Sequence, residues 1–170
     1  DTAWNGVRFT LVDTAGLALD AQDELGKNVV KQIEIALAEA EAVLFVVDGK
    51  DTRAALPQTT LKKFRSIKKP LFLCVNKMDS PTKREEQLAE FSSLGIKPMF
   101  PVSSISGRGI GDMLDHIVEI ISKKTEEREE ETDIENQPTG GPIAISIVGK
   151  PNVGKSSIMN SLLGQERVVV

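Results

Sequence analysis

Residues 149–156 read GKPNVGKS, which combines the glycines, lysine and serine that phosphate binding requires. The run matches the pattern GxxxxGK[ST] and lies between an apolar stretch at 143–148 and a predicted helix at 154–163. Glycines let backbone N–H groups wrap a diphosphate, and the start of a helix adds partial positive charge. We therefore expect Lys155 to reach the β- and γ-phosphates and Ser156 to coordinate Mg²⁺. The pattern arises by chance in under about 1% of chains of this length.

A second candidate site is Asp13-Thr14-Ala15-Gly16, which follows the apolar run RFTLV. A carboxylate at Asp13 can hold magnesium through a water molecule, and the Gly16 N–H can contact a γ-phosphate. A DxxG pattern alone is weak, because about one is expected by chance in a chain of this length. Its place after a predicted strand strengthens the interpretation of this motif as part of a phosphate site.

Two further motifs have the chemistry to recognise a guanine base. Asn76-Lys77-Met78-Asp79 follows the apolar run PLFLCV. An aspartate there can accept hydrogen bonds from the N1–H and the exocyclic amine of guanine, a pattern that adenine does not offer. Ser103-Ser104-Ile105 follows the next predicted strand, where a backbone N–H can meet the guanine O6. That loop is a weak signal without its neighbours, since serine-rich turns before helices are common.

The composition is that of an ordinary globular protein. The 170 residues are 40% hydrophobic and 27% charged, which suits one domain and argues against a disordered chain. A net charge of −4 disfavours a nucleic-acid-binding surface spread over the whole protein. The single cysteine, Cys74, excludes a disulfide framework. The N-terminal residues lack the features of a signal peptide and no apolar run has membrane-spanning length, so we expect a cytoplasmic protein or one of an organelle stroma.

Predicted strands alternate with predicted helices, which favours a mainly parallel sheet covered by helices. The Asn5-Gly6 pair favours a tight turn, so a short first strand should pair antiparallel with 7–13. Further strands are predicted at 42–48, 70–76, 99–103 and 143–148, and helices at 25–40, 57–67, 83–94, 110–124 and 154–163. Residues 123–142 are acidic, polar and turn-rich, so we predict a flexible linker between residues 1–122 and 143–170.

All four motifs follow predicted parallel strands, and open α/β sheets bind ligands at that edge. Together the motifs resemble the P-loop GTPases, and GKPNVGKSS, LVDTAGL, NKMD and PVSSISGRGIGDMLD resemble more narrowly the bacterial-type Der (EngA) family. Members of that family carry two GTPase domains joined by an acidic linker. The chain is similar to the last two-thirds of the first domain, that linker and the opening of the second. The resemblance implies a three-layer Ras-like G domain that binds GTP or GDP with Mg²⁺, with the ribosome or ribosomal RNA as a partner.

The resemblance also assigns roles to individual residues. Those expected to contact the nucleotide are Asn152, Val153, Gly154, Lys155, Ser156, Ser157, Asn76, Lys77, Asp79, Ser103, Ser104 and Ile105. Those expected to act in catalysis are Lys155, Gly16 and Asn152. The expected metal ligands are Ser156 and, through water, Asp13 for Mg²⁺, with Asn152 helping to hold K⁺.

The order of the motifs differs from that of an ordinary GTPase, in which the phosphate loop comes first. Here it comes last, and a strand, a loop and a single helix cannot bury an apolar sheet face alone. Residues 1–122 in turn lack a central strand. We therefore predict that 143–170 completes the same six-stranded sheet, as in a circularly permuted G domain with its break in switch I. A linker of this length reaches roughly 20 to 25 Å, which also permits exchange of 143–170 between two chains as a swapped dimer.

Two features predict slow GTP hydrolysis. No segment that corresponds to the switch I loop is visible between Val170 and Asp1, and Leu17 stands where Ras-like enzymes place the glutamine that orients water. The resemblance implies a potassium-assisted route instead, and nucleotide binding should survive. Two alternatives stay open, a nucleotide-dependent ribosome-binding module and an inactive piece of a tandem GTPase that binds GDP without turnover.

Overall fold

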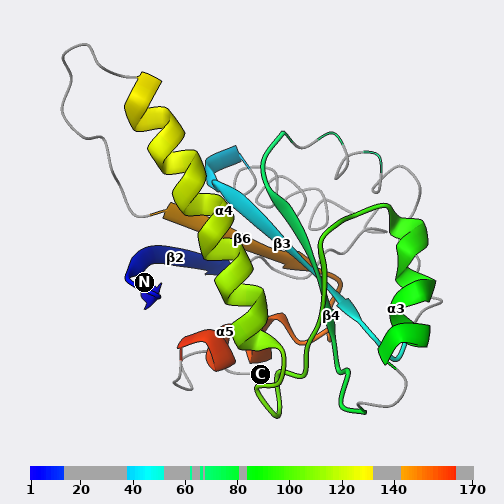
Figure 1. The fold of residues 1–170 in the computed structure, drawn as a ribbon. Coiled ribbons are helices and arrows are strands. Elements are labelled where there is room, and N and C mark those ends of the chain that lie inside the picture. The colour runs from blue at the N-terminus through cyan, green and yellow to red at the C-terminus, as the bar shows by residue number, and fades with distance from the viewer. Residues whose placement is uncertain are drawn as a thin grey trace, which may run out of the picture.

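The computed structural model describes residues 1–13, 38–51, 62, 66, 68–80, 84–131 and 143–163. Within them a six-stranded sheet has the order β1-β2-β6-β3-β4-β5 (Figure 1). Its strands are β1 (Thr2–Trp4), β2 (Val7–Asp13), β3 (Ala42–Asp48), β4 (Leu71–Asn76), β5 (Met99–Pro101) and β6 (Ile143–Gly149). β1 pairs antiparallel with β2, and every other pair of neighbours is parallel. The predicted parallel sheet with one antiparallel edge strand is therefore confirmed.

The strand that comes last in the chain lies in the middle of the sheet. β6 pairs with β2 through residues 143–147 opposite 9–13, and with β3 through residues 145–149 opposite 42–46. Because both pairings are parallel, the loop after β6 leaves the sheet at the edge where β2, β3 and β4 also end (Figure 1). This strand order is the circularly permuted G-domain order that the sequence predicts.

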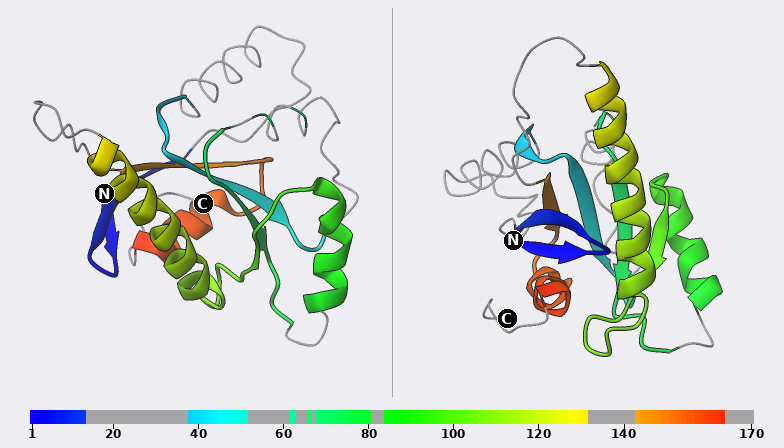
Figure 2. Two further views of the ribbon diagram at one scale, coloured as in Figure 1. Left: turned by 45° about the horizontal axis from the view of Figure 1, so that its top comes forward. Right: turned by 60° about the vertical axis from the view of Figure 1, so that its left-hand side comes forward.

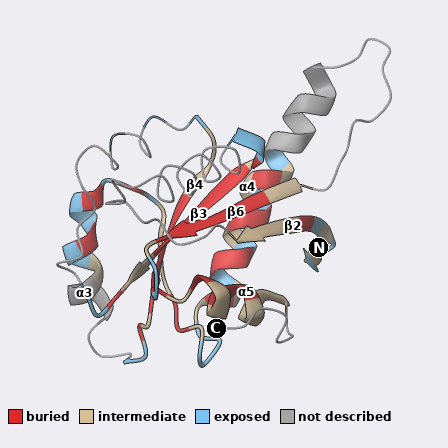
Figure 3. Ribbon diagram, turned by 180° about the vertical axis from the view of Figure 1, so that it is seen from behind, coloured by how far each residue is buried: buried red, intermediate tan, exposed pale blue. Residues whose placement is uncertain are grey.

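Helices cover both faces of the sheet. α4 (Ile110–Glu131) and α5 (Lys155–Leu163) pack on one face, over the larger group of buried apolar side chains. α3 (Arg84–Phe91) and the 3-10 turn Ser92–Leu94 pack on the other face. Figure 3 shows β3, β4 and β6 buried along most of their length, as central strands of a three-layer fold are. No helix in the described part of the chain is long and apolar enough to cross a membrane.

The N-terminal hairpin is tied to α4, beside which it lies in Figure 2. Trp4 Nε1 donates a hydrogen bond to Asp115 Oδ1 at 2.6 Å, and Asn5 Nδ2 donates to the same oxygen at 2.8 Å. Asn5 and Gly6 have φ values of 46° and 83°, in the left-handed region that an Asn-Gly turn requires. The hairpin that this pair predicts is therefore confirmed.

The boundary predicted for the linker is wrong. Composition predicts a flexible segment from residue 123, but α4 continues to Glu131. Glutamate, lysine and arginine are good helix formers, so a charged run can extend a helix without burying anything. Lys123 Nζ also pairs with Glu119 Oε1 at 2.6 Å, one helical turn earlier. Residues 132–142, and most of the helices predicted at 25–40 and 57–67, lie outside the described residues.

Candidate nucleotide-binding site

The phosphate loop joins β6 to α5 in a conformation that demands permissive residues. Asn152 has a φ of 63° and Gly154 a φ of 92°, both in the left-handed region. A Cβ atom on Gly149 would overlap the Val46 carbonyl oxygen, and one on Gly154 would overlap the Asn76 side-chain amide. The glycines of the pattern are therefore required by close packing against β3 and β4 as well as by backbone conformation.

Asn76, the last residue of β4, connects the phosphate loop to the serine-rich loop. Its Nδ2 donates to the Val153 carbonyl oxygen at 2.9 Å, and its Oδ1 accepts from the Ser104 backbone N–H at 3.0 Å. Only 1% of the residue is exposed. Losing either hydrogen bond would leave a buried polar group unpaired, so Asn76 holds the two loops at a fixed spacing. Both of its amide atoms are used within the protein.

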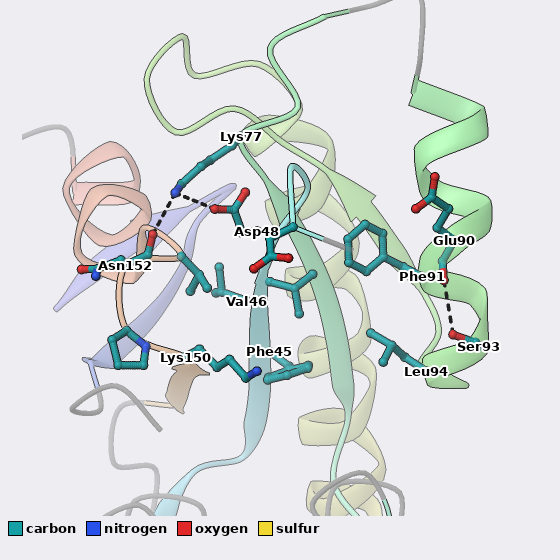
Figure 4. A pocket seen from close by; sticks show the side chains of 14 residues that line it. Phe45, Val46, Asp48, Lys77, Glu90, Phe91, Ser93, Leu94, Lys150 and Asn152 are labelled. Carbon is teal, nitrogen blue, oxygen red and sulfur yellow. Dashed lines mark hydrogen bonds and ion pairs between the residues drawn. The ribbon is translucent and has the colours of Figure 1, made fainter. Parts of the chain in front are cut away.

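Lys77 makes a second connection at this edge of the sheet, between the phosphate loop and the end of β3. Its Nζ donates to the Asn152 carbonyl oxygen at 2.8 Å and pairs with Asp48 Oδ2 at 2.7 Å (Figure 4). Its φ of 65° turns the chain sharply after β4. Lys77 thus holds the outer part of the phosphate loop against the end of β3.

Asp79 is held by two donors. Ser103 Oγ donates to Asp79 Oδ1 at 2.7 Å, and Lys50 Nζ pairs with Asp79 Oδ2 at 2.7 Å. The hydrogen bond from Lys50, followed by that from Ser103, lowers the pKa of the Asp79 carboxyl. The side chain is 45% exposed, so an ionised carboxylate faces solvent. Ile105, in the same loop as Ser103, is 88% exposed.

Asp13 and Ser156 come together beneath the phosphate loop. Ser156 Oγ donates to Asp13 Oδ2 at 3.1 Å, across two segments far apart in the chain. The other carboxylate oxygen, Oδ1, is buried and has no hydrogen-bond partner among the described residues. A hydroxyl beside a carboxylate with a spare oxygen is the donor set that Mg²⁺ uses next to phosphates, directly and through water. These residues therefore fit a magnesium ion.

Lys155 points into the phosphate loop. Its Nζ donates to the Lys150 carbonyl oxygen at 3.1 Å, and the residue is 8% exposed. Burial lowers the pKa of the ammonium group, and the nearby Asp13 carboxylate opposes that shift. A buried cation beside the backbone of the phosphate loop is ready to pair with an anion such as a phosphate.

The remaining predicted residues divide into two groups. Ser157 is half-buried in the first turn of α5, and no hydrogen bond from another described residue to its side chain defines its role. Gly16, with Thr14, Ala15 and Leu17, lies outside the described residues. The structure thus brings together Asp13 of the DxxG motif, the phosphate loop and both candidate guanine motifs.

Sequence reasoning missed the turn after β3. Asp48 and Lys50 contact Lys77 and Asp79, although the run Asp48-Gly49-Lys50 belongs to none of the four motifs. The signal that was available is position, because DGK follows a buried parallel strand and so lies at the ligand edge.

A cavity of about 250 Å³ lies on the α3 face of the sheet, next to this edge (Figure 4). Phe45, Phe91 and Leu94 are among its apolar walls, and Lys77 and Asn152 lie at its border with the phosphate loop. Asp13, Lys155 and Ser156 do not line it. The cavity is therefore separate from the position that fits magnesium.

The strand order and the loops at this edge define a P-loop GTPase domain. Residues 1–123 match the family model described as elongation factor Tu GTP binding domain, and residues 144–170 match the model described as 50S ribosome-binding GTPase. Curated relatives named GTPase Der are 41% identical in Symbiobacterium thermophilum, 42% in Chloroflexus aurantiacus and 39% in Clostridium perfringens, each over 100% of this chain. The chain belongs to the Der (EngA) family of P-loop GTPases.

The chain spans about a third of the length of these relatives, with 34% of the first, 37% of the second and 36% of the third covered. Among solved structures, YjeQ from Thermotoga maritima is similar with a TM-score of 0.46 and 18% identity, over 72% of this chain and 38% of that one.

Proposed function

We propose that this chain binds GDP and GTP at the carboxyl edge of its sheet. The observation that carries the proposal is the buried Asn76 side chain, which joins the phosphate loop to the loop beside Asp79. A nucleotide has its phosphates and its base at opposite ends, so a site for it needs this fixed spacing. The family also consists of GTP-binding proteins by name.

Asp79 is the proposed base-recognition residue. Its carboxylate can accept the N1–H and the exocyclic amine of guanine, whereas adenine presents an acceptor at N1. The backbone of Ser104 and Ile105 lies in the adjacent loop, where an N–H can meet the guanine O6. Lys77 contributes by bracing the edge.

Lys155, Ser156 and Asp13 are the proposed phosphate and magnesium residues. Lys155 supplies a positive charge inside the loop, and backbone N–H groups from Asn152 to Ser157 supply the remaining donors. Ser156 would coordinate Mg²⁺ directly and Asp13 would hold it through water. When bound, magnesium neutralises charge on the β- and γ-phosphates.

A titration of GDP against ADP by calorimetry tests this proposal. GDP should bind on the order of 10⁴ times more tightly than ADP, because the site is built around hydrogen bonds that only guanine makes. Asp79→Asn should remove most of that preference. The matched control is Asp112→Asn, which changes an exposed carboxylate on α4 and should leave it intact. Equal affinities for GDP and ADP would contradict the proposal.

Hydrolysis by the 170-residue polypeptide should be slow, since none of its stretches resembles the switch I loop. Asn152 is the proposed potassium residue, because its side chain is exposed and makes no hydrogen bond within the described residues. Turnover should be higher in KCl than in NaCl, and Asn152→Ala should remove that difference. Equal turnover in the two salts would argue against a potassium site.

The ribosome is the proposed partner of the nucleotide-bound state. Residues 144–170 match a family described as 50S ribosome-binding GTPase. Pelleting of the chain with ribosomes should depend on whether GDP or a nonhydrolysable GTP analogue is bound. Pelleting that is the same with both nucleotides would leave only the nucleotide-binding part of the proposal standing.

A further inference from the structure

The turns that follow β3 and β4 are in direct contact. The first turn is residues 48–50 and the second is residues 77–79. The Gly49 backbone N–H donates to the Asn76 carbonyl oxygen at 2.7 Å, and a Cβ atom on Gly49 would lie only 2.6 Å from Met78 Sδ. The glycine is therefore what allows the two turns to approach.

Two ion pairs connect these turns, and each turn supplies one acidic and one basic residue. Lys77 Nζ lies 2.7 Å from Asp48 Oδ2, and Lys50 Nζ lies 2.7 Å from Asp79 Oδ2. The Lys77 ammonium also donates to the phosphate loop, so it is fixed by two partners. The Lys50 side chain is 60% exposed, and Asp79 is the only described partner of its ammonium group. The Lys50 pair is therefore the one that can open at little cost.

The Lys50 pair lies where the base is expected. Asp79 Oδ1 already accepts from Ser103 Oγ, and Oδ2 accepts from Lys50 Nζ. Guanine presents two donors, N1–H and the exocyclic amine, and needs both oxygens of Asp79. Hypoxanthine lacks the amine and needs only one of them. Each carboxylate oxygen has two lone pairs, so one donor does not by itself fill it. Lys50 Nζ, however, contacts Oδ2 where both side chains are exposed to solvent, which is the side from which a base must approach. The ammonium group of Lys50 and the second donor of guanine therefore compete for the same side of Oδ2.

We propose that Lys50 is a specificity-determining residue, because its ion pair with Asp79 Oδ2 must open when the guanine amine binds that oxygen. The inference rests on the proposed guanine site. Its consequence is that Lys50 weakens guanine binding, speeds guanine nucleotide release and lowers the preference for guanine over hypoxanthine. The cost of displacing an exposed ion pair corresponds to about a two- to fivefold change in affinity.

The test compares GDP with inosine diphosphate in wild type, Lys50→Met and Lys50→Arg. Lys50→Met keeps the length of the side chain but removes its charge. It should bind GDP about two- to fivefold more tightly and release fluorescent GDP correspondingly more slowly, with a smaller change for inosine diphosphate. Lys50→Arg keeps the charge and should behave like wild type. The difference between Lys50→Met and wild type should also shrink at high salt, which screens exposed charges.

Three outcomes would overturn the inference. An unchanged or faster GDP release in Lys50→Met would show that Lys50 does not compete with the base. An equal gain for both nucleotides would show that Lys50 acts on the overall charge of the site and not on the second oxygen. Absence of GDP binding by the wild type would overturn the proposed function and the inference with it, whereas the first two outcomes leave the proposed function intact.

Discussion

The two halves of the site are built differently. The phosphate region, formed by residues 149–157 with Asp13, is held by buried groups and by glycines packed against neighbouring strands. In the base region, formed by residues 76–79 and 103–108, Asn76 and Ser103 are buried, whereas Asp79 and Ile105 are exposed. The difference suits the proposed site, in which packed backbone would hold the phosphates and exposed side chains would contact the base.

The contrast between the two regions would not describe a single molecule if the regions belonged to different chains. Residues 143–163 complete the sheet within one chain in the structure, but exchange between two chains would produce the same strand order. We expect a monomer of 18.5 kDa by light scattering at micromolar concentration. A strictly monomeric mass would exclude the exchange, whereas a mass of twice that value, persisting on dilution, is what exchange of residues 143–170 requires.

Asn76 is the residue that couples the two regions, so Asn76→Ala should have the largest effect of a single substitution. It leaves the Val153 carbonyl oxygen and the Ser104 N–H without their partner in a buried environment. The free energy of unfolding should fall by roughly 2–4 kcal/mol, measured by urea denaturation. GDP affinity should fall with it, because both regions lose their fixed spacing.

The matched control for Asn76→Ala is Asn152→Gly. Asn152 is exposed and has a positive φ that glycine adopts freely, so stability should change by less than about 0.5 kcal/mol. Similar losses for both variants would mean that burial of the asparagine amide is not what stabilises this edge.

Most of this architecture is encoded locally, and the two features that the sequence did not predict have different causes. Buried apolar runs predict β3, β4 and β6, and the GKPNVGKS pattern locates the phosphate loop, because each depends on residues adjacent in sequence. The contacts of Lys50 depend on two strands lying side by side and on the space left by Gly49. The sequence places the end of α4 too early, because an acidic composition indicates a linker where helix propensity in fact extends the helix.

Two glycines with positive φ distinguish the regions further. Gly154, in the phosphate region, packs so closely on Asn76 that a Cβ atom would overlap it, whereas a Cβ atom on Gly107, in the base region, would meet nothing within 4 Å. Gly107→Ala should cost about 1 kcal/mol of stability from backbone strain alone. Gly154→Ala should cost at least about 2 kcal/mol, because overpacking adds to the strain, and it should weaken GDP binding. Equal costs in urea denaturation would show that both loops adjust to a side chain, which would remove the contrast between the regions.

The smallest expected effect is a change in the pKa of Asp79. The hydrogen bond from Lys50 is the first cause of its lowered pKa, so Lys50→Met should raise that pKa toward the ordinary value of about 3.9. A carboxyl whose pKa is lowered by folding stabilises the protein above its unfolded pKa, and that contribution is lost as the pH falls through the folded value. Lys50→Met should therefore lose the contribution of Asp79 at a higher pH than wild type does.

Carboxyl chemical shifts followed by NMR are the suitable measurement, because both partners are exposed and the stability change is small. Lys123→Met is the matched control, since Lys123 lowers the pKa of Glu119 in the same way on α4, far from the site. It should raise the pKa of Glu119 and leave that of Asp79 unchanged. The contrary result is an unchanged pKa of Asp79 in Lys50→Met alongside a shifted pKa of Glu119 in Lys123→Met. That result would mean that the ion pair between Lys50 and Asp79 does not persist in solution. The hydrogen bond from Ser103 would then be what lowers the pKa of Asp79.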